Sequence, residues 1–291
     1  PYPDCVSAVL ATHDSTDDLA YELFGDSTTA TGQPINISHG EMPLRASWNL
    51  VDALAAESVT ILPIPDSFFG TYPAAGDFLL FGNGPDTQTE FGIILSVEEG
   101  LLEVSRGIMD TVPMNWAIGN RCWVIPARSI TGDPTRRSAF EVAKYRLLTI
   151  TSRGKLPFED SPELNVTLSE RPHLPLRPAN VKVGATAFGT ANIGAGNAVF
   201  TWANRNRIIE ATQVLQWTDA TTAPETGQTT KIYLLHAVTR DLIYQVSGIT
   251  GTTHTLTPAN FSGNTSAIAR VVAVRDGMES LQGHEILIQR S

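Results

Sequence analysis

The sequence predicts a mainly β protein, in which an N-terminal β domain with a barrel or sandwich-like sheet precedes an immunoglobulin-like β-sandwich. Three observations predict this fold class. Gly (23 residues) and Pro (18 residues) recur between short apolar runs, charged residues make up only 17% of the chain, and few segments have a helical period. Short strands joined by turns produce this pattern. The 42% hydrophobic fraction of the 291 residues is enough to build a core in each half.

The first half of the chain contains short apolar runs that are mostly bounded by Gly, Pro, Asn or Asp. They predict strands at 58–63, 78–81, 92–97, 101–105, 121–125 and 145–150. Residues 98–100 (EEG) separate two of these runs and predict a hairpin loop. One helix of about three turns is expected at 47–58, because Leu50, Ala53 and Leu54 recur at helical spacing.

A proline-rich stretch predicts the boundary between two domains. Residues 171–180 (RPHLPLRPAN) place three prolines in seven positions, which favours an extended and stiff connector. We therefore expect a β-rich domain at 1–170, a linker at 171–180 and a second β domain at 181–291.

After the connector, apolar runs recur at fairly regular intervals and predict about seven strands over roughly 110 residues, as in an immunoglobulin-like sandwich. The expected strands lie at 198–202, 208–217, 231–238, 242–246, 253–256, 267–274 and 285–289. In the first of them, alternation places Phe200 and Trp202 on one face, where both are expected in the core. Trp123 lies in the apolar run at 121–125 and is also expected to be a core residue.

Three segments of the C-terminal part resemble a fibronectin type III domain. Residues 198–202 (AVFTW) are similar to the second strand of that family, 247–255 (SGITGTTHT) to the segment entering its fifth strand, and 269–280 (ARVVAVRDGMES) to its sixth strand and the following loop. Ala267 stands where the family usually has a tyrosine that pins a corner of the sandwich. Another side chain is therefore expected to fill that corner.

A second resemblance covers more of the chain, and it is to the tail-tip proteins of long-tailed bacteriophages. These are baseplate hub or central-fibre proteins, related to the hub proteins of gene transfer agents. The segments that carry the resemblance are 105–113 (SRGIMDTVP), 119–123 (GNRCW), 151–157 (TSRGKLP), 177–181 (RPANV), 201–207 (TWANRNR) and 275–285 (RDGMESLQGHE). Trp116 stands where the resemblance would place a histidine.

The resemblance implies a structural part of a virion rather than an enzyme. Such a part is expected at the distal tip of the tail, assembled in the host cytoplasm, as a homotrimer around the tail axis. Its implied partners are other tail-tip or baseplate proteins and a glycan or protein receptor on the host surface. Because Pro1 is not an initiator Met, and the first residues have no basic or apolar leader, we expect the chain to be a slice of a longer protein.

The charge pattern excludes some classes of partner. The net charge is −10, and no dense patch of Lys and Arg is present, so a groove that follows the phosphates of a nucleic acid is not expected. The longest apolar runs, such as 91–97, are far shorter than the roughly 18 residues that a membrane span needs, so no span is expected.

The sequence contains no pattern typical of a catalytic, metal or cofactor site. The six histidines have no HxxxH or HExxH spacing, and Ser152 and Lys155 have the SxxK spacing without its companion motifs. Paired acids at 17–18 and 98–99 are adjacent in predicted loops, where two carboxyls rarely face each other across a cleft. The acids of 14–18 lack the spacing of a calcium loop. No catalytic residue, metal or cofactor is expected.

Two aromatic residues are candidates for contact with a receptor. Trp116 and Trp217 lie beside polar or loop residues, so their rings could stack on the sugar rings of a host glycan. The alternative for both is packing at a domain or subunit interface, where tryptophan is also enriched. Cys5 and Cys122 are expected to be small buried hydrophobes, although a disulfide between them stays open.

Two other function classes remain open at this point. The chain could be a tail enzyme that degrades host polysaccharide, which would need a pair of carboxylates in a cleft. It could also be a bacterial carbohydrate-binding module with an appended fibronectin-like domain.

Overall fold

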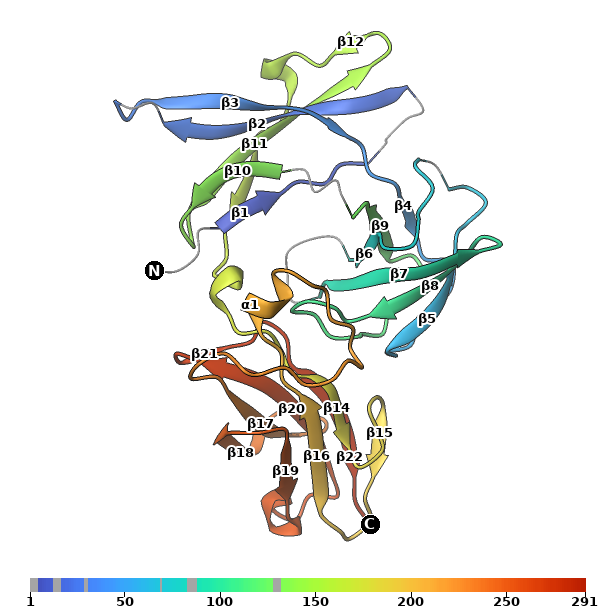
Figure 1. Ribbon diagram of the computed structural model, residues 1–291, viewed down its shortest axis with the longest axis vertical. Helices are drawn as coiled ribbons and strands as arrows, with labels where there is room; N and C mark the ends of the chain where they lie inside the picture. The colour runs from blue at the N-terminus through green and yellow to red at the C-terminus, as the bar shows by residue number, and fades with distance from the viewer. Residues whose placement is uncertain (1–4, 13–16, 29–30, 69, 83–87, 128–131) are drawn as a thin grey trace.

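The computed structural model describes the chain except residues 1–4, 13–16, 29–30, 69, 83–87 and 128–131. The protein is mainly β, as predicted, and its strands form three layers of structure that follow one another along the long axis (Figure 1). We call them the upper sheet, the middle sheet and the sandwich. None of the helices in the described ranges is long and apolar enough to cross a membrane.

The upper sheet combines strands from both ends of the N-terminal half. Its order is β12 (Gly154–Lys155), β11 (Val142–Thr151), β2 (Asp18–Thr28) and β3 (Pro34–Pro43), with β13 (Leu164–Thr167) also paired to β11. Beside it, β1 (Cys5–Ala8) pairs with β10 (Gly132–Arg137). A small core of Tyr21, Leu23, Met42, Ala143 and Tyr145 is buried against this sheet.

The middle sheet is built from the segment between β3 and β10. Its order is β4 (Ser47–Asn49), β9 (Arg121–Ile125), β6 (Phe78–Phe81), β7 (Glu90–Glu98), β8 (Leu101–Arg106) and β5 (Val59–Pro63). Its own core includes Leu62, Leu79, Ile94 and Leu102, which are almost fully buried. Residues 1–170 therefore contain two hydrophobic cores where the sequence suggested one domain.

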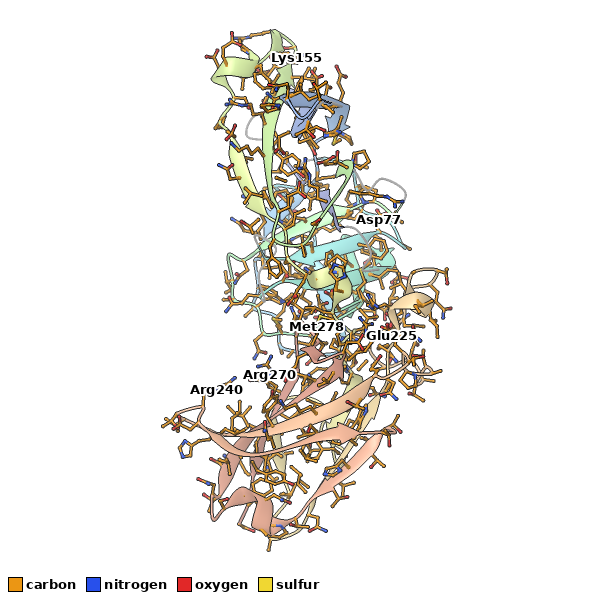
Figure 2. The ribbon with its side chains drawn as sticks, turned by 90° about the vertical axis from the view of Figure 1, so that its left-hand side faces the viewer. Asp77, Lys155, Glu225, Arg240, Arg270 and Met278 are labelled. Carbon is orange, nitrogen blue, oxygen red and sulfur yellow. The ribbon has the colours of Figure 1, made fainter. Side chains whose placement is uncertain are left out.

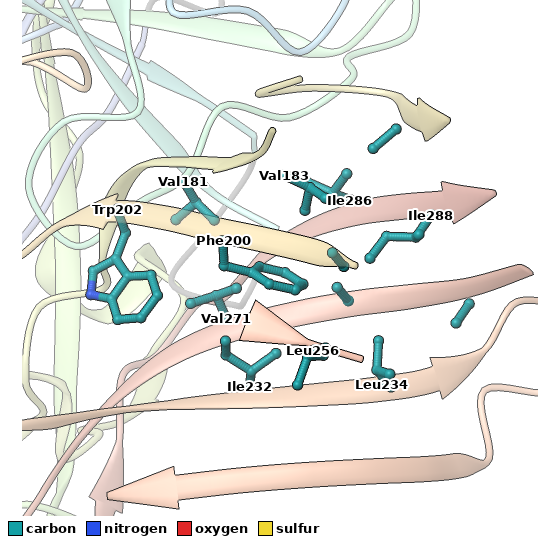
Figure 3. Packing of buried hydrophobic residues seen from close by; sticks show 14 of the residues in the cluster. Val181, Val183, Phe200, Trp202, Ile232, Leu234, Leu256, Val271, Ile286 and Ile288 are labelled. Carbon is teal, nitrogen blue, oxygen red and sulfur yellow. The ribbon is translucent and has the colours of Figure 1, made fainter. Parts of the chain in front are cut away.

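The sandwich packs a three-stranded sheet against a larger one. The first has the order β14 (Ala179–Val183), β16 (Ala198–Ala203) and β19 (Thr253–Leu256). The second has the order β15 (Thr190–Asn192), β22 (His284–Gln289), β20 (Ser266–Arg275), β17 (Thr229–His236) and β18 (Leu242–Ile249), with β21 (Met278–Glu279) paired to β20. Figure 3 shows the apolar side chains between the sheets, among them Phe200 and Trp202, which are buried as predicted.

Phe261 occupies the corner of the sandwich where the resemblance would place a tyrosine. It ends the short helix η3 (Pro258–Phe261), which connects β19 to β20, and its side chain is fully buried in the same core as Ala267. The guanidinium of Arg290 lies over its ring, 4.7 Å from the centroid. The corner is thus filled by an aromatic residue from the connection instead of from the strand.

Two predicted elements are wrong. The segment 47–58 contains the strand β4 and irregular chain instead of a helix, because Leu50 and Leu54 form backbone hydrogen bonds to residues 116–120. The segment 208–217 contains part of the helix α1 (Arg207–Glu210) and turns instead of a strand. The long strands β2 and β3 were missed. β3 is mostly exposed, whereas β2 alternates and buries Tyr21 and Leu23.

Cys122 is a free thiol in the core of the middle sheet, with no exposed surface. Burial raises the pKa of this thiol, so the reactive thiolate is disfavoured. We expect Cys122 to resist alkylation by iodoacetamide in the native protein and to react after unfolding in urea. The measurement is mass spectrometry of a Cys5→Ser variant, and rapid labelling of the native variant would contradict the burial.

Candidate functional site: the joint between the middle sheet and the sandwich

The main polar site among the described residues is not a surface cleft but a buried network between the middle sheet and the sandwich. We call it the joint. It consists of residues 89–91 at the start of β7, the loop 106–116, the connector 171–178, the loop 204–225 and the segment 275–284. These segments are far apart in sequence and meet here. Figure 2 shows Glu225 and Met278 on its sandwich side, whereas Lys155 lies at the distant end of the upper sheet.

Glu90, at the start of β7, forms the centre of the joint on the side of the middle sheet. Its carboxylate and the guanidinium of Arg106 are both fully buried and form a two-point ion pair, with N–O distances of 2.5 and 2.7 Å. The same carboxylate accepts hydrogen bonds from the backbone N–H groups of Gly107 (3.2 Å) and Met114 (2.9 Å) and from Nε1 of Trp116 (2.8 Å). Five donors thus satisfy one buried charge, which is what makes its burial tolerable.

This arrangement sets the course of the loop that follows β8. Gly107 has φ of +64°, and a Cβ at this position would lie 2.3 Å from the ring of Pro113, so only glycine fits. Thr111 closes the loop from the other side, because its Oγ1 accepts a hydrogen bond from the backbone N–H of Phe91 (3.0 Å). The loop therefore presents its backbone carbonyls in fixed positions.

The side chain of Arg177, in the connector, binds two of those carbonyls. Its guanidinium is fully buried and donates to the carbonyl oxygens of Thr111 (2.5 Å) and Gly107. It also lies over the ring of Trp217, 5.0 Å from the centroid. Burial lowers the pKa of Arg177 to about 9. Nearby, Arg171 forms a two-point ion pair with Asp110 (2.5 and 2.7 Å).

The sandwich also bonds directly to the middle sheet. The side chain of Gln282 accepts a hydrogen bond from the N–H of Val112 (2.8 Å) and donates to the carbonyl of Thr89 (2.7 Å). Val112 belongs to the core of the sandwich, and Met114 packs against the cores of both layers. The apolar cores are therefore nearly continuous across the joint, with the polar network around them.

A second group of charges holds the connector against the sandwich. The carboxylate of Glu225 pairs with Arg207 (2.9 Å) and with Arg275. Both arginines also donate to carbonyls of the connector, Arg275 to that of His173 and Arg207 to that of Pro172. The proline-rich stretch is consequently a packed segment, and its last two residues already belong to β14.

Arg205 organises the loop that carries Trp217. Its side chain is fully buried and donates to the carbonyl oxygens of Asn204 (3.0 Å), Gln216 (2.9 Å), Asp219 (3.1 Å) and Ala220 (3.1 Å). The part of this loop that follows α1 thus has several of its carbonyls satisfied by one cation.

The two candidate receptor residues lie inside the joint, which corrects the expectation of surface contact. Trp116 is 7% exposed, bonds to Glu90 and stacks on Phe81. Trp217 is 1% exposed and packs against Arg177 and His284. Neither ring presents a face to a sugar, because both faces are covered by protein. Packing at a domain interface, the alternative given for both residues in the sequence analysis, agrees better with their positions.

The remaining sequence candidates are dispersed. Trp123, expected in the core, is half-buried on β9 under the guanidinium of Arg121 (5.4 Å to the ring centroid). Lys155 is half-exposed and pairs with Glu22. The acids 98–99 form the tip of the β7–β8 hairpin, and 14–16 lie outside the described residues. Among the residues that the structure describes, no group of three or more His, Cys, Asp or Glu could hold a metal.

Sequence reasoning missed Glu90, Arg106, Arg177 and Gln282 as site residues. The available signal was that three of them, all except Glu90, lie within the segments that carry the tail-tip resemblance. No protein-family model matches the chain, and no curated protein matches it.

Two buried titratable groups in the joint give opposite dependences of stability on pH. Burial raises the pKa of Glu210 to about 7, so its protonation stabilises the fold as pH falls from 7 to 4.5. Burial lowers the pKa of His284 to about 4, so its contribution is complete above pH 6.5 and is lost as pH falls towards 4. The two contributions oppose each other between pH 6.5 and 4.5.

We expect substitutions to separate the two contributions. Between pH 7.5 and 4.5, the stability deficit of His284→Gln relative to the wild type should shrink by about 2–3 kcal/mol, because only the wild type loses the histidine contribution. Glu210→Gln should be more stable than the wild type at pH 8 and equal to it near pH 5. Urea denaturation at each pH measures both, and parallel curves for wild type and His284→Gln would contradict the assignment.

Proposed function

We propose that this chain is a structural component of a bacteriophage tail tip, in the baseplate or central fibre, and that it contributes to attachment to the host surface. One observation carries the proposal. Four of the six segments that resemble tail-tip proteins (105–113, 177–181, 201–207 and 275–285) supply the loops and arginines of the joint.

In this proposal, these segments fix the orientation of the layers and have no catalytic role. Domains within one chain usually move relative to each other unless their interface is large and apolar. Here the hydrogen bonds of Arg177 and Gln282, the ion pair of Arg171 with Asp110 and the packing of Met114 join the middle sheet to the connector and the sandwich. A part that positions host-binding elements at the end of a tail needs such a fixed orientation.

The proposed partners follow from the resemblance and from charge. Other tail-tip proteins would surround the chain in the virion, assembled in the host cytoplasm, and a homotrimer would multiply weak contacts with a host glycan or protein receptor. The net charge of −10 suits an exposed virion surface.

Localisation on virions tests the structural role. Antibodies raised against residues 1–291 are expected to label the distal tail tip of intact particles in electron microscopy, and tryptic peptides of the chain should be found in purified virions by mass spectrometry. Absence of the peptides from purified virions would overturn the proposal.

Cell binding tests the attachment role separately. Fluorescently labelled 1–291 is expected to bind susceptible host cells and not receptor-deficient mutants. If the chain is present at the tail tip but binds neither cell type, it is a scaffold for another adhesin. If it shortens cell-surface polysaccharide, the enzyme class replaces this proposal.

A further inference from the structure

The middle sheet ends in an open strand edge next to a groove. The strand β5 is the last in the sheet order and, among the residues that the structure describes, pairs only with β8 (Figure 1). Beside it, a groove of about 640 Å³ is lined by Ile61, Ser96, Glu98, Glu99, Leu101 and Glu103. This edge lies outside the joint and has no part in the function proposed above.

The hydrogen-bond pattern shows which backbone groups of β5 face outward. The N–H of Arg106 donates to the carbonyl of Ser58 (2.9 Å), and the N–H of Ile64 donates to that of Gly100 (2.8 Å). Because bonded residues alternate in an antiparallel ladder, residues 58, 60, 62 and 64 face β8. Val59 and Ile61 therefore direct their N–H and C=O groups to the open edge.

The edge has little of the protection that such strands usually carry. Exposed edges are commonly guarded by lysine or by charge, yet β5 (VTILP) contains no charged residue. The side chains of Val59 and Ile61 are 38% and 55% exposed, and Leu101 is 45% exposed on the same face of the sheet. Pro63 has no N–H to donate and limits pairing at one end.

The negative charge of the groove indicates what kind of partner segment would bind there. Glu103 lies directly opposite Ile61, and Glu98 lies opposite Leu101, so both carboxylates share the face of the exposed aliphatic side chains. No Lys or Arg lines the groove, and no ion pair is formed by Glu98, Glu99 or Glu103 within the described part of the chain. Two copies of this edge would repel each other through these carboxylates.

We propose that β5 is a docking edge for an extended segment of a partner protein that carries aliphatic and basic residues together on one face, at every second position, with small polar residues on the other face. The segment adds as an antiparallel or parallel strand to Val59 and Ile61, and its backbone completes their hydrogen bonds. Its aliphatic side chains cover Val59 and Ile61, and its Lys or Arg side chains meet Glu103 and the hairpin tip at 98–99. The negative charge of the groove favours a basic partner segment. The backbone hydrogen bonds to Val59 and Ile61 fix the register of that segment.

The first test uses the octapeptide TVTKTVTK, which places valine and lysine on one face and threonine on the other, with TVTETVTE as the control. Fluorescence anisotropy is expected to show saturable binding of the lysine peptide to the full chain, weakened by salt, and at least tenfold weaker binding of the glutamate peptide. Amide NMR shifts should be confined to β5 and its neighbours. Equal binding of both peptides, or no saturable binding, would overturn the proposal.

Variants identify the edge. Ile61→Lys, at an exposed position, should weaken binding at least tenfold, and Glu103→Gln should weaken it about threefold. Matched controls are Ile37→Lys on the edge strand β3, where the side chain is 38% exposed, and Glu159→Gln in the short helix η1 (Phe158–Asp160). Neither should change binding. Equal losses in Ile61→Lys and Ile37→Lys would contradict the site. If Ile61→Lys instead lowers the molar mass in light scattering, the occupant is a second copy and the proposal fails.

Discussion

Replacing Glu90 by alanine is expected to lower the free energy of unfolding by about 3–5 kcal/mol, the cost of breaking a buried ion pair from one side. The substitution would leave the guanidinium of Arg106 charged and buried without its carboxylate. It would also remove the acceptor for Trp116 and for two backbone N–H groups of the loop 106–116. Urea denaturation followed by tryptophan fluorescence measures the change.

Two comparisons separate the buried charge from a general effect of truncation. Glu57→Ala, at an exposed position, should change stability by less than about 0.5 kcal/mol. The double variant Glu90→Met/Arg106→Met should recover part of the loss, because neither charge then remains unpaired. A loss below about 1 kcal/mol for Glu90→Ala would show that the network does not hold the loop.

Replacing Arg177 by alanine is expected to cost about 3 kcal/mol or more and to uncouple the layers of the molecule. Two hydrogen bonds from a charged group would be lost, each contributing about 1.5–3 kcal/mol, and the carbonyls of Gly107 and Thr111 would stay buried without this donor. Because Arg177 joins the connector to the loop of the middle sheet, calorimetry should show the sandwich and the rest of the chain unfolding in separate transitions.

Arg240 offers a matched control for that experiment. It forms a two-point ion pair with Glu285, but its side chain is 48% exposed at the far side of the sandwich (Figure 2). Arg240→Ala should therefore cost less than about 1 kcal/mol and leave the shape of the transition unchanged. A single transition in Arg177→Ala, at unchanged midpoint, would show that the joint does not depend on this residue.

The sequence by itself determined much of the sandwich and of the middle sheet. Alternation of apolar residues is a local property, so strands such as 78–81, 121–125 and 253–256 were predicted within a residue or two, and Phe200 and Trp202 were placed in the core. The strands β2 and β3 were not predicted. β3 is mostly exposed and has only a weak apolar period, whereas β2 does carry a period of two, with Tyr21 and Leu23 buried.

Only the tertiary structure decided the joint. Gln282 bonds to Val112 and Thr89, which are 170 and 193 residues away in the chain, and no local pattern reports such a contact. The same is true of Leu50 and Leu54. Their spacing in the sequence is that of a helix, but in the structure their backbones bond to residues 116–120. Trp116 and Trp217 were candidates for receptor contact because their sequence neighbours are polar. Neighbours such as Asn115 and Thr218 are indeed exposed, but both rings are buried in the joint, where Trp116 bonds to Glu90. Burial of a polar group depends on partners that the fold brings from elsewhere, and for that reason the sequence alone could not place it.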